Sequence, residues 1–445
     1  MKTNKDKNLA MDIAKKVDEK GGKTFFVGGF VRDSLLGFTS KDIDLEVHGL
    51  NPLELKEILS SFGQPTENGK SFGVFGLKGH DLDIAMPRKE ICVGEKHTDF
   101  IVDVDPHIGE RNAAKRRDFT INALMMDVLT GEVLDFFGGK EDLSNGMIRH
   151  IDDASFVEDP LRVLRAAQFA ARFNFGISED TKSLCKNISL KSLSKERIFG
   201  ETEKALLKAK KPSIFFKELR NVDQLGFWFP EVKALIGVPQ NKAHHQEGDV
   251  WNHTMLVLDE AAKRRAKTSN QIAFMLSALC HDFGKAVCTV KDTDGRVRAI
   301  GHEKLGLPLV QAFLSRLASG KKVVNFVLNM VELHQQPNQI ANDKARVKAS
   351  NKMFDKSISP KDLVSLSVCD GLGKIPAKEN QDFLLNRLDL FNKTMSKPFV
   401  RGQDLIEAGL TPGKRFATLL AHAHKLRLAG VDKATALKQV VAMNN

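Results

Sequence analysis

The sequence of 445 residues contains no tyrosine, although it has 29 phenylalanines, so none of the motifs described below depends on a phenol. Cysteine is scarce as well, and its five residues are scattered without a close CxxC spacing. This distribution argues against a disulfide framework or a zinc ribbon and suits a reducing compartment, so we expect a cytoplasmic protein. No apolar run is long enough to span a bilayer, and the charged, amphipathic N-terminal stretch lacks the apolar centre of a secretory signal. We therefore expect no membrane association.

The net charge of +11 is unevenly distributed along the chain. Residues 1–145 hold 20 Lys and Arg against 25 Asp and Glu, a balance of −5, whereas residues 146–445 hold the other 47 against 31, a balance of +16. The basic balance of residues 146–445 favours a polyanionic partner such as a nucleic acid, whereas the acidic residues 1–145 must have another role. A solvated charged surface is the alternative interpretation.

Hydrophobic periodicity divides the chain into an α+β front and an all-helical remainder. In the front, the stretches KTFFV, DIDLEV, FGVFGL, HDLDIAM and GEVLDFF predict strands of a small mixed or antiparallel sheet, with helices between them. From about residue 158 onward, apolar residues recur with helical spacing. We expect four parts, with these bounds: residues 1–145, 146–235, 236–350 and 351–445.

The stretch VGGFVRDSLLGFTSKDIDLEVHG carries the clearest chemical signal in the front. A strand ends at Gly28-Gly29, where the backbone can turn sharply, and the helix that follows directs free N–H groups at any ligand there. The next strand alternates apolar side chains with three carboxylates, those of Asp42, Asp44 and Glu46. If HDLDIAM pairs beside this strand, Asp83 joins Asp42 and Asp44. Three carboxylates beside a phosphate cradle are what two Mg²⁺ ions and a nucleoside triphosphate require.

This order of strand, double glycine, helix, turn and DxD strand resembles the nucleotidyltransferase fold of the DNA polymerase β superfamily, in its bacterial tRNA nucleotidyltransferase and poly(A) polymerase branch. Later motifs of that branch are resembled by RRDFTINAL, DFFGGKEDLSNGMIRHI, EDPLRVLRAAQFAARF and ERIFGETEKAL. The resemblance implies a nucleotidyltransferase head followed by a helical neck, body and tail. It also implies an enzyme that adds CCA to tRNA 3′ ends from CTP and ATP without a nucleic-acid template.

The resemblance also assigns roles to single residues. Asp42, Asp44 and Asp83 would be the catalytic carboxylates, with Mg²⁺ on Asp42 and Asp44. Nucleotide contacts are implied for a set of glycines, arginines and their partners: Gly28, Gly29, Arg32, Asp33, Arg117, Asp118, Asn122, Asp159, Arg162 and Arg165. Within this set, Asp159 and Arg162 are three residues apart, which would place them on one helical face. An acceptor and a forked donor side by side can address the Watson–Crick edge of C or A.

A second pattern lies in the body, where imidazoles and carboxylates occur in a fixed order: His253, His281, Asp282, His302, His334 and Asp370. Such ligands at the end of a buried helix suit a divalent transition metal. The set resembles the HD phosphohydrolase superfamily, which implies 2′,3′-cyclic phosphodiesterase or phosphatase activity with Ni²⁺, Co²⁺ or Mn²⁺. A folded site that has lost its function is the alternative. We assign no role to His244 and His245, which precede this set.

Several alternatives remain open. Within the class, these are a poly(A) polymerase or an enzyme that adds only CC or only A. The poly(A) branch usually carries a basic Arg-Arg-Phe stretch where this chain has NGKSFGVFGL, which favours tRNA. A phosphohydrolase with a relic transferase head conflicts with the intact GG, DxD and RRD motifs, and a pure RNA-binding protein would not need three carboxylates. The expected partners are tRNA, ATP and CTP, with no obligatory protein partner.

Overall fold

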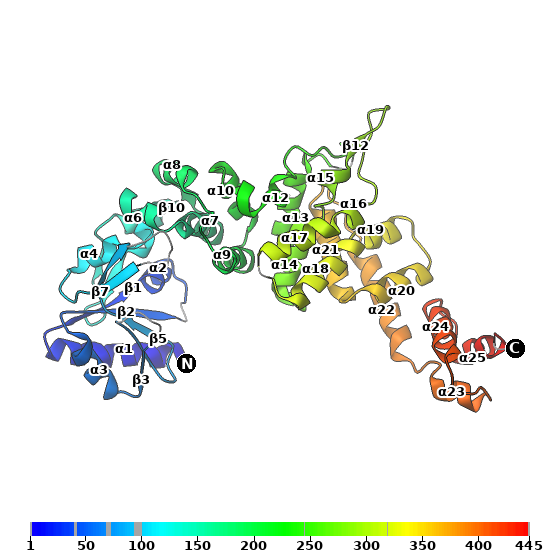
Figure 1. Cartoon of the computed structure of the whole chain (residues 1–445), viewed down its shortest axis with the longest axis horizontal. Helices are drawn as coiled ribbons and strands as arrows, with labels where there is room; N and C mark the ends of the chain where they lie inside the picture. Colours follow the sequence, from blue (N-terminus) through cyan, green and yellow to red (C-terminus); the bar gives the residue numbers. More distant parts are fainter. Residues whose placement is uncertain are drawn as a thin grey trace. The chain divides into compact units, whose positions relative to one another are not determined.

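The computed structural model describes residues 2–39, 42–67, 73–92, 100–243, 245–317 and 319–443. The stretch NGKSFGVFGL therefore lies partly outside the described residues. The chain forms two compact units, drawn in Figure 1. The first consists of Met1–Thr202 and Ile214–Phe227, and the second of Glu203–Ser213 and Trp228–Asn445. The finer division into four parts stays a prediction.

A seven-stranded mixed sheet forms the centre of the first unit (Figure 1). Its strand order is β3-β4-β5-β2-β1-β8-β9, and among these described strands only β2 and β5 run parallel as neighbours. The predicted mixed sheet is thus confirmed. The strand bounds are β1(Lys23–Val27), β2(Ile43–His48), β3(Pro65–Glu67), β4(Val74–Leu77), β5(Leu82–Ala85), β8(Met125–Asp127) and β9(Val133–Leu134).

The alternation of β2 decides which of its faces is buried. Ile43, Leu45 and Val47 are at most 1% exposed, because every second side chain of a strand points to the same side. Helix α1(Lys2–Glu19) packs against β1 and β2 and also against α3(Pro52–Ser60). Asn51 caps α3, and its side chain accepts the backbone N–H of Glu54 at 3.0 Å.

Helices and two short strand pairs complete the first unit. The hairpin β6(Arg88–Cys92)–β7(Phe100–Val104) was not predicted, nor was the short parallel pair β10(Met147–Ile148)–β11(Gly176–Ile177). The helices, with one 3₁₀ turn, are α2(Gly29–Leu35), α4(Glu110–Lys115), η1(Thr120–Asn122), α5(Gly139–Asn145), α6(Asp153–Glu158), α7(Leu161–Phe173), α8(Glu179–Asn187) and α10(Ser213–Asn221), and α9(Lys195–Lys208) continues from the first unit into the second.

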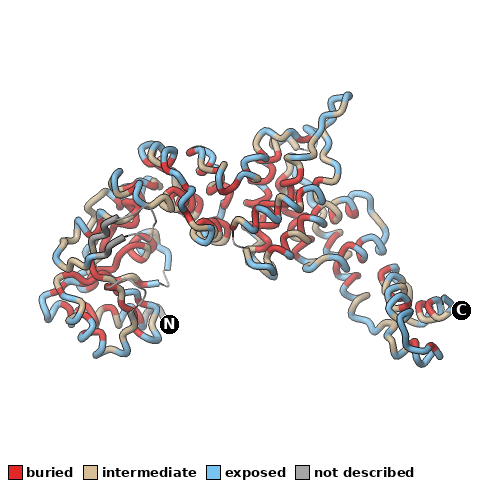
Figure 2. The backbone as a smooth tube through the Cα atoms, viewed as in Figure 1, coloured by how far each residue is buried: buried red, intermediate tan, exposed pale blue. Residues whose placement is uncertain are grey.

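The second unit is almost entirely helical, as expected. At its centre α14(Gln271–Cys280) packs against α13(Val250–Arg264), α18(Lys321–Leu333) and α21(Pro360–Leu372). All residues of α14 from Ala273 to Cys280 are buried (Figure 2), because a helix without a polar face has to be surrounded by other elements. Further elements of this unit are α15(Lys285–Cys288), β12(Val290–Lys291), β13(Val297–Arg298), α16(His302–Leu305), α17(Leu307–Arg316), α19(Gln335–Asn342), α20(Val347–Lys356) and α22(Gln381–Ser396).

The end of the chain has an apolar cluster of its own. It is formed by α23(Gly402–Glu407), α24(Arg415–Leu428) and α25(Lys433–Ala442), and its buried residues are Leu405, Leu410, Leu419, Ala423 and Val440. None of the helices in the described part of the chain combines the length and the apolar character that a bilayer crossing requires.

Two candidate active sites

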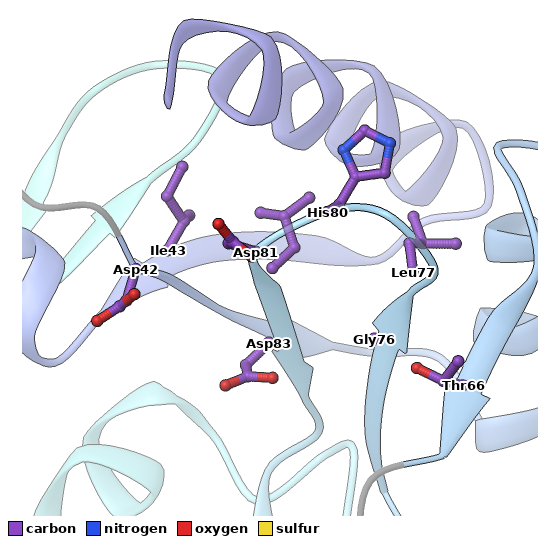
Figure 3. A pocket seen from close by; sticks show the side chains of 9 residues that line it. Asp42, Ile43, Thr66, Gly76, Leu77, His80, Asp81 and Asp83 are labelled. Atoms are coloured by element: carbon purple, nitrogen blue, oxygen red, sulfur yellow. The ribbon is translucent and has the colours of Figure 1, made fainter. Parts of the chain in front are cut away.

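The two acidic stretches of the first unit meet where β2 and β5 run side by side. Asp44 and Asp83 are direct partners in the register of this parallel pair, and Asp42 immediately precedes β2. The conditional prediction that the two strands are neighbours is therefore confirmed. Asp42 and Asp83 also border a cavity of about 270 Å³, shown in Figure 3. On another side of this cavity, Nδ1 of His80 lies 2.6 Å from the Asp6 carboxylate of α1.

Gly28 makes room for this cluster of charges. Its φ of 63° lies in the left-handed region that favours glycine. A Cβ at this position would lie 2.9 Å from Nη1 of Arg117 and 3.6 Å from Oδ2 of Asp44. Both the backbone conformation and the close approach of the two side chains explain why the chain has glycine here.

The electrostatics around Asp44 favour a bound cation. Burial raises the pKa of Asp44, and the charges of Asp83 and Asp42 raise it further against the opposing effect of Arg117. A divalent cation would relieve the repulsion between these carboxylates, and carboxylate oxygens are ligands that Mg²⁺ accepts. The residues present therefore fit the expected metal.

Glu46 does not belong to an open acidic face, although the alternation of β2 suggested that it would. Its side chain is 1% exposed, with Oε2 lying 3.1 Å from Arg116 and 3.4 Å from Arg117. Burial alone would raise the pKa of Glu46, but the hydrogen bond with His48 and the two arginine charges lower it to about 2. Glu46 thus holds both arginines of the RRD motif, of which Arg117 lies beside Asp44.

Predicted nucleotide-binding residues of three elements form one hydrogen-bonded network. Arg165 of α7 donates to Oδ2 of Asp118 at 2.6 Å, and Oδ1 of Asp118 accepts from Asn122 at 2.9 Å. Asn122 in turn accepts from Arg32 at 2.5 Å, and Arg32 donates to Asp33 at 2.6 Å. Burial would raise the pKa of Asp118, but Arg165 and Asn122 outweigh burial and lower it. The network ties the helix after the double glycine to α7.

The guanidinium of Arg32 is enclosed in this network. The side chain is 4% exposed, and its guanidinium carbon lies 5.1 Å from the ring centre of Phe169 and 4.7 Å from that of Phe173. Arg172 holds the second oxygen of Asp33 at 3.1 Å. Arg32 therefore donates three hydrogen bonds to Asp33 and Asn122, and the prediction that it contacts phosphate directly stays a prediction.

Asp159 and Arg162 are close together, but Asp159 lies outside helix α7. Pro160 follows it, and a residue that precedes proline is disfavoured in the helical conformation. The Asp159 carboxylate accepts from Arg197 at 2.9 and 3.0 Å, whereas Arg162 donates to the backbone carbonyl of Ser155 at 2.7 Å. Arg197 was not among the predicted residues, although it lies in the quoted ERIFGETEKAL stretch.

All six predicted ligands of the second unit converge in one place. None of the six is more than 6% exposed. The ligand atoms of His253, His281 and Asp370 lie within 4.8 Å of one another, and so do those of another group: Asp282, His302 and His334.

Asp282 connects the two groups. Its Oδ2 lies 3.2 Å from Nε2 of His281, and its Oδ1 lies 3.1 Å from Nε2 of His302 and 3.7 Å from that of His334. The buried Oδ2 accepts no well-aligned hydrogen bond, although the Lys285 ammonium lies 2.7 Å away. Converging imidazole nitrogens with such an oxygen fit a divalent transition metal.

The turn that carries the His-Asp pair requires a glycine for packing. A Cβ on Gly284 would lie 2.0 Å from the backbone carbonyl oxygen of His302. The φ of Gly284 is −64°, so the requirement is the close approach of two backbones and not an unusual conformation. The helix α14 ends before His281, and the glycine allows the next turn to bring His302 to Asp282.

Two residues beside this site were not predicted from the sequence. Glu247 lies 3.0 Å from Nδ1 of His253 and 2.6 Å from Nδ1 of His245, to which no role had been assigned. Lys285 pairs with Asp282 and donates to Gln240 at 3.0 Å. An isolated carboxylate in a connector carries no periodicity, so only its proximity to His253 reveals Glu247.

Two families match parts of the chain. The family described as "Poly A polymerase head domain" matches residues 24–149, and the one described as "Probable RNA and SrmB- binding site of polymerase A" matches residues 174–236. The first range contains the carboxylates on β2 and β5.

Curated relatives and solved structures agree with these matches. A "Multifunctional CCA protein" of Pasteurella multocida is 40% identical over 70% of this chain and 74% of its own, and one of Mannheimia succiniciproducens is 42% identical over 66% and 70%. The structure of a Thermotoga maritima CCA-adding enzyme complexed with tRNA matches 98% of this chain and 95% of its own, with a TM-score of 0.67. At 24% identity, this last likeness shows the fold alone.

Proposed function

Because the chain belongs to the tRNA nucleotidyltransferase family of multifunctional CCA proteins, we propose that its first unit adds CMP, CMP and AMP to tRNA 3′ ends from CTP and ATP. The observation that carries this proposal is the register of Asp44 and Asp83 beside Gly28. The RNA-binding family match and the +16 balance of residues 146–445 support tRNA as the partner. Enzymes of this family use divalent metal ions, and oxygen ligands alone in the head favour Mg²⁺.

Each head residue has a distinct task in the proposed phosphoryl transfer. Asp42, Asp44 and Asp83 would hold two Mg²⁺ ions, which when bound activate the attacking 3′-hydroxyl and stabilise the leaving pyrophosphate. Gly28 and Gly29 allow the triphosphate to approach the backbone closely at the start of α2. Arg117, held beside Asp44 by Glu46, offers its positive charge to the triphosphate.

We assign base selection to Asp159 and Arg162. The carboxylate accepts and the guanidinium donates, which matches the mixed donors and acceptors on the edges of C and A. Arg165, Asp118, Asn122, Arg32 and Asp33 support this pair indirectly, because their network connects α7 to the helix after the double glycine.

The test of the head assignment is nucleotide incorporation into a tRNA that lacks its 3′ end, with each labelled triphosphate supplied separately. We expect CMP and AMP to be incorporated by the wild type and Asp44→Asn to lower incorporation at least a thousandfold, an effect of about 4 kcal/mol on the barrier. Binding of tRNA should stay within twofold of the wild type. Asp12→Asn, which removes an exposed carboxylate of the same unit, is the control. Near-normal incorporation by Asp44→Asn contradicts the assignment, and incorporation of AMP alone in long runs would indicate a poly(A) polymerase.

A second activity is favoured by the metal-ligand set of the other unit. We propose that it hydrolyses 2′,3′-cyclic phosphates and phosphate monoesters with a transition metal such as Ni²⁺, Co²⁺ or Mn²⁺. Support comes from the convergence of His253, His281 and Asp370 on one side of Asp282 and of His302 and His334 on the other. The cavity next to His302 is lined by Lys285 and Arg298, which suits an anionic substrate.

Stripping and restoring metal tests this second activity. Protein freed of metal should hydrolyse no 2′,3′-cyclic nucleotide, and it should recover activity with Ni²⁺, Co²⁺ or Mn²⁺ but not with Mg²⁺. If the wild-type protein shows no hydrolysis with any of these ions, the second activity is contradicted and only the transferase proposal remains. We place both activities in the cytoplasm, which the unpaired buried thiols of Cys185, Cys280 and Cys369 support.

A further inference from the structure

Three of the four histidines around Asp282 are held in the same way. Nδ1 of His281, His302 and His334 lies 2.8, 2.8 and 2.6 Å from the backbone carbonyl oxygen three residues earlier. A carbonyl oxygen can only accept, so Nδ1 carries the proton in each ring. The lone pair of each Nε2 is therefore directed at the centre of the site.

His253 is held differently. Its Nδ1 lies 3.0 Å from Oε1 of Glu247 and 3.3 Å from the carbonyl oxygen of Gly373, while its Nε2 lies 3.1 Å from Asp370. A carboxylate binds an imidazole N–H more strongly than a carbonyl does, and it increases the electron density at the opposite nitrogen. Of the four rings, His253 alone has a carboxylate outside the ligand set within 3.0 Å of Nδ1 among the described residues.

Glu247 is fully engaged by groups of the protein. Its side chain is 1% exposed, Oε1 lies 2.6 Å from Nδ1 of His245, and Oε2 accepts the backbone N–H of Ile375 at 2.9 Å. Burial would raise its pKa, but the hydrogen bonds with His253 and His245 outweigh burial and lower it to about 2. Both oxygens already serve as acceptors for the protein, as expected of a residue that orients ligands.

His245 extends the arrangement from the ligand set to a neighbouring cavity. It borders a cavity of about 160 Å³ whose wall also includes Lys285, Arg298, His302 and Gln335. The ligand His302 lies on the same wall, so a phosphate in this cavity would be next to the metal-ligand set. Two cations and the amide donor of Gln335 are groups that bind phosphate oxygens, whereas Nε2 of His245, whose Nδ1 proton faces Glu247, can accept a hydrogen bond from a substrate hydroxyl group.

We propose that Glu247 is a positioning residue with two tasks: it fixes His253 with Nε2 toward the metal, and it holds His245 at the cavity wall, where the lone pair on Nε2 of His245 accepts a hydrogen bond from a hydroxyl group of the substrate. The proposal rests on the proposed hydrolytic function of this unit. It assigns His245 a substrate-binding role and makes Glu247 the connection between metal binding and substrate binding.

Metal binding by the full chain tests the first task. Co²⁺ is titrated in excess Mg²⁺, which occupies the oxygen ligands of the head, and binding is followed by the visible absorption of Co²⁺. We expect Glu247→Ala to weaken Co²⁺ binding 10- to 100-fold and to alter the spectrum. Glu247→Gln keeps an acceptor for Nδ1 of His253 and should lose less affinity than Glu247→Ala. Glu332→Gln, which changes an exposed residue on the helix before His334, should bind as the wild type does.

Steady-state hydrolysis of a 2′,3′-cyclic nucleotide tests the second task. His245→Ala should raise KM at least fivefold while the Co²⁺ affinity stays within twofold of the wild type. Glu247→Ala should change both quantities, because it releases both rings. This split separates a positioning role from a general loss of folding, which would also lower the thermal stability of the unit.

Each result supports or overturns the proposal. If Glu247→Ala and Glu247→Gln bind Co²⁺ as the wild type does, the first task is wrong; if His245→Ala leaves KM unchanged, the second is wrong. Loss of one whole ion, with the others bound at wild-type affinity, would make Glu247 a ligand together with His245 and His253 and would overturn the positioning role. A wild type that neither binds Co²⁺ in excess Mg²⁺ nor hydrolyses the substrate contradicts the proposed function itself.

Discussion

Single residues decide how close the charged groups of the head can come. Gly28 has no Cβ where one would lie 2.9 Å from Arg117, and Glu46 is buried so that it holds Arg117 from the other side. The Asp44 carboxylate shares this space with Arg117. The position of the Arg117 guanidinium relative to the Asp44 carboxylate thus depends on Gly28 and Glu46. Neither of these two residues has a reactive role in the proposed transfer.

The chain contains a matched pair of glycines for testing this point. Gly28 and Gly37 lie near the two ends of α2 with φ of 63° and 74°, but a Cβ on Gly37 would meet nothing within 4 Å. Replacing either by Ala should cost about 1–3 kcal/mol of stability, because a backbone with positive φ is strained for residues with a Cβ. Only Gly28→Ala should reduce CMP incorporation, by at least tenfold. Equal activity of the two variants, measured beside their melting temperatures, would contradict this role of Gly28.

At the scale of elements, helix α7 connects the proposed base-selecting pair to the residues of the proposed nucleotide cradle. Arg165 on α7 reaches Asp118, and Arg172 on the same helix reaches Asp33 in α2. Asp159 stands just before this helix and is held by Arg197 of α9. Three helices therefore determine where the proposed base-reading pair stands.

Mutation of Arg197 tests this arrangement without changing Asp159 or Arg162 themselves. We expect Arg197→Ala to reduce discrimination between CTP and UTP by on the order of tenfold, about 1.4 kcal/mol, because Asp159 loses the partner that fixes it. Arg197→Lys keeps the charge without the fork and should give an intermediate loss. The measurement is the ratio of incorporation efficiencies for the two triphosphates. Lys195→Ala, which changes an exposed residue of the same helix, is the control. Unchanged selectivity in Arg197→Ala would contradict the proposed dependence of base selection on an Asp159 fixed by Arg197.

At the scale of the whole molecule, the two candidate sites belong to different compact units. The carboxylates Asp44 and Asp83 lie in the first unit, and the ligand set around Asp282 lies in the second. Their donor chemistry differs as well, since oxygen ligands favour Mg²⁺ and imidazoles favour a softer ion.

The activities of the two units should therefore be separable by mutation. Asp282→Ala should abolish hydrolysis of 2′,3′-cyclic phosphates and leave CCA addition within twofold of the wild type. Asp44→Ala should do the reverse. Both assays are carried out on both full-length variants after metal is stripped and each ion is restored. Loss of both activities in either variant would show that the sites depend on each other.

Local sequence patterns determined much of the fold. The stretch KTFFV matches β1(Lys23–Val27), and PLELKEILSSF contains α3(Pro52–Ser60). The all-round apolar stretch before His281 is the buried helix α14. Such features depend on spacing within a few residues, which the sequence shows directly. The motifs likewise determined the family, since their order along the chain does not depend on packing.

Only the tertiary structure decided which distant residues meet. It pairs Glu46 with Arg116 and Arg117, places the guanidinium of Arg32 against two phenylalanine rings, and brings Glu247 to His253. The strand β8(Met125–Asp127) next to β1 belongs to the same group of unpredicted features. These contacts arise because burial forces each charged group to find partners wherever the packing of other elements supplies them, and no periodicity in the sequence records that choice.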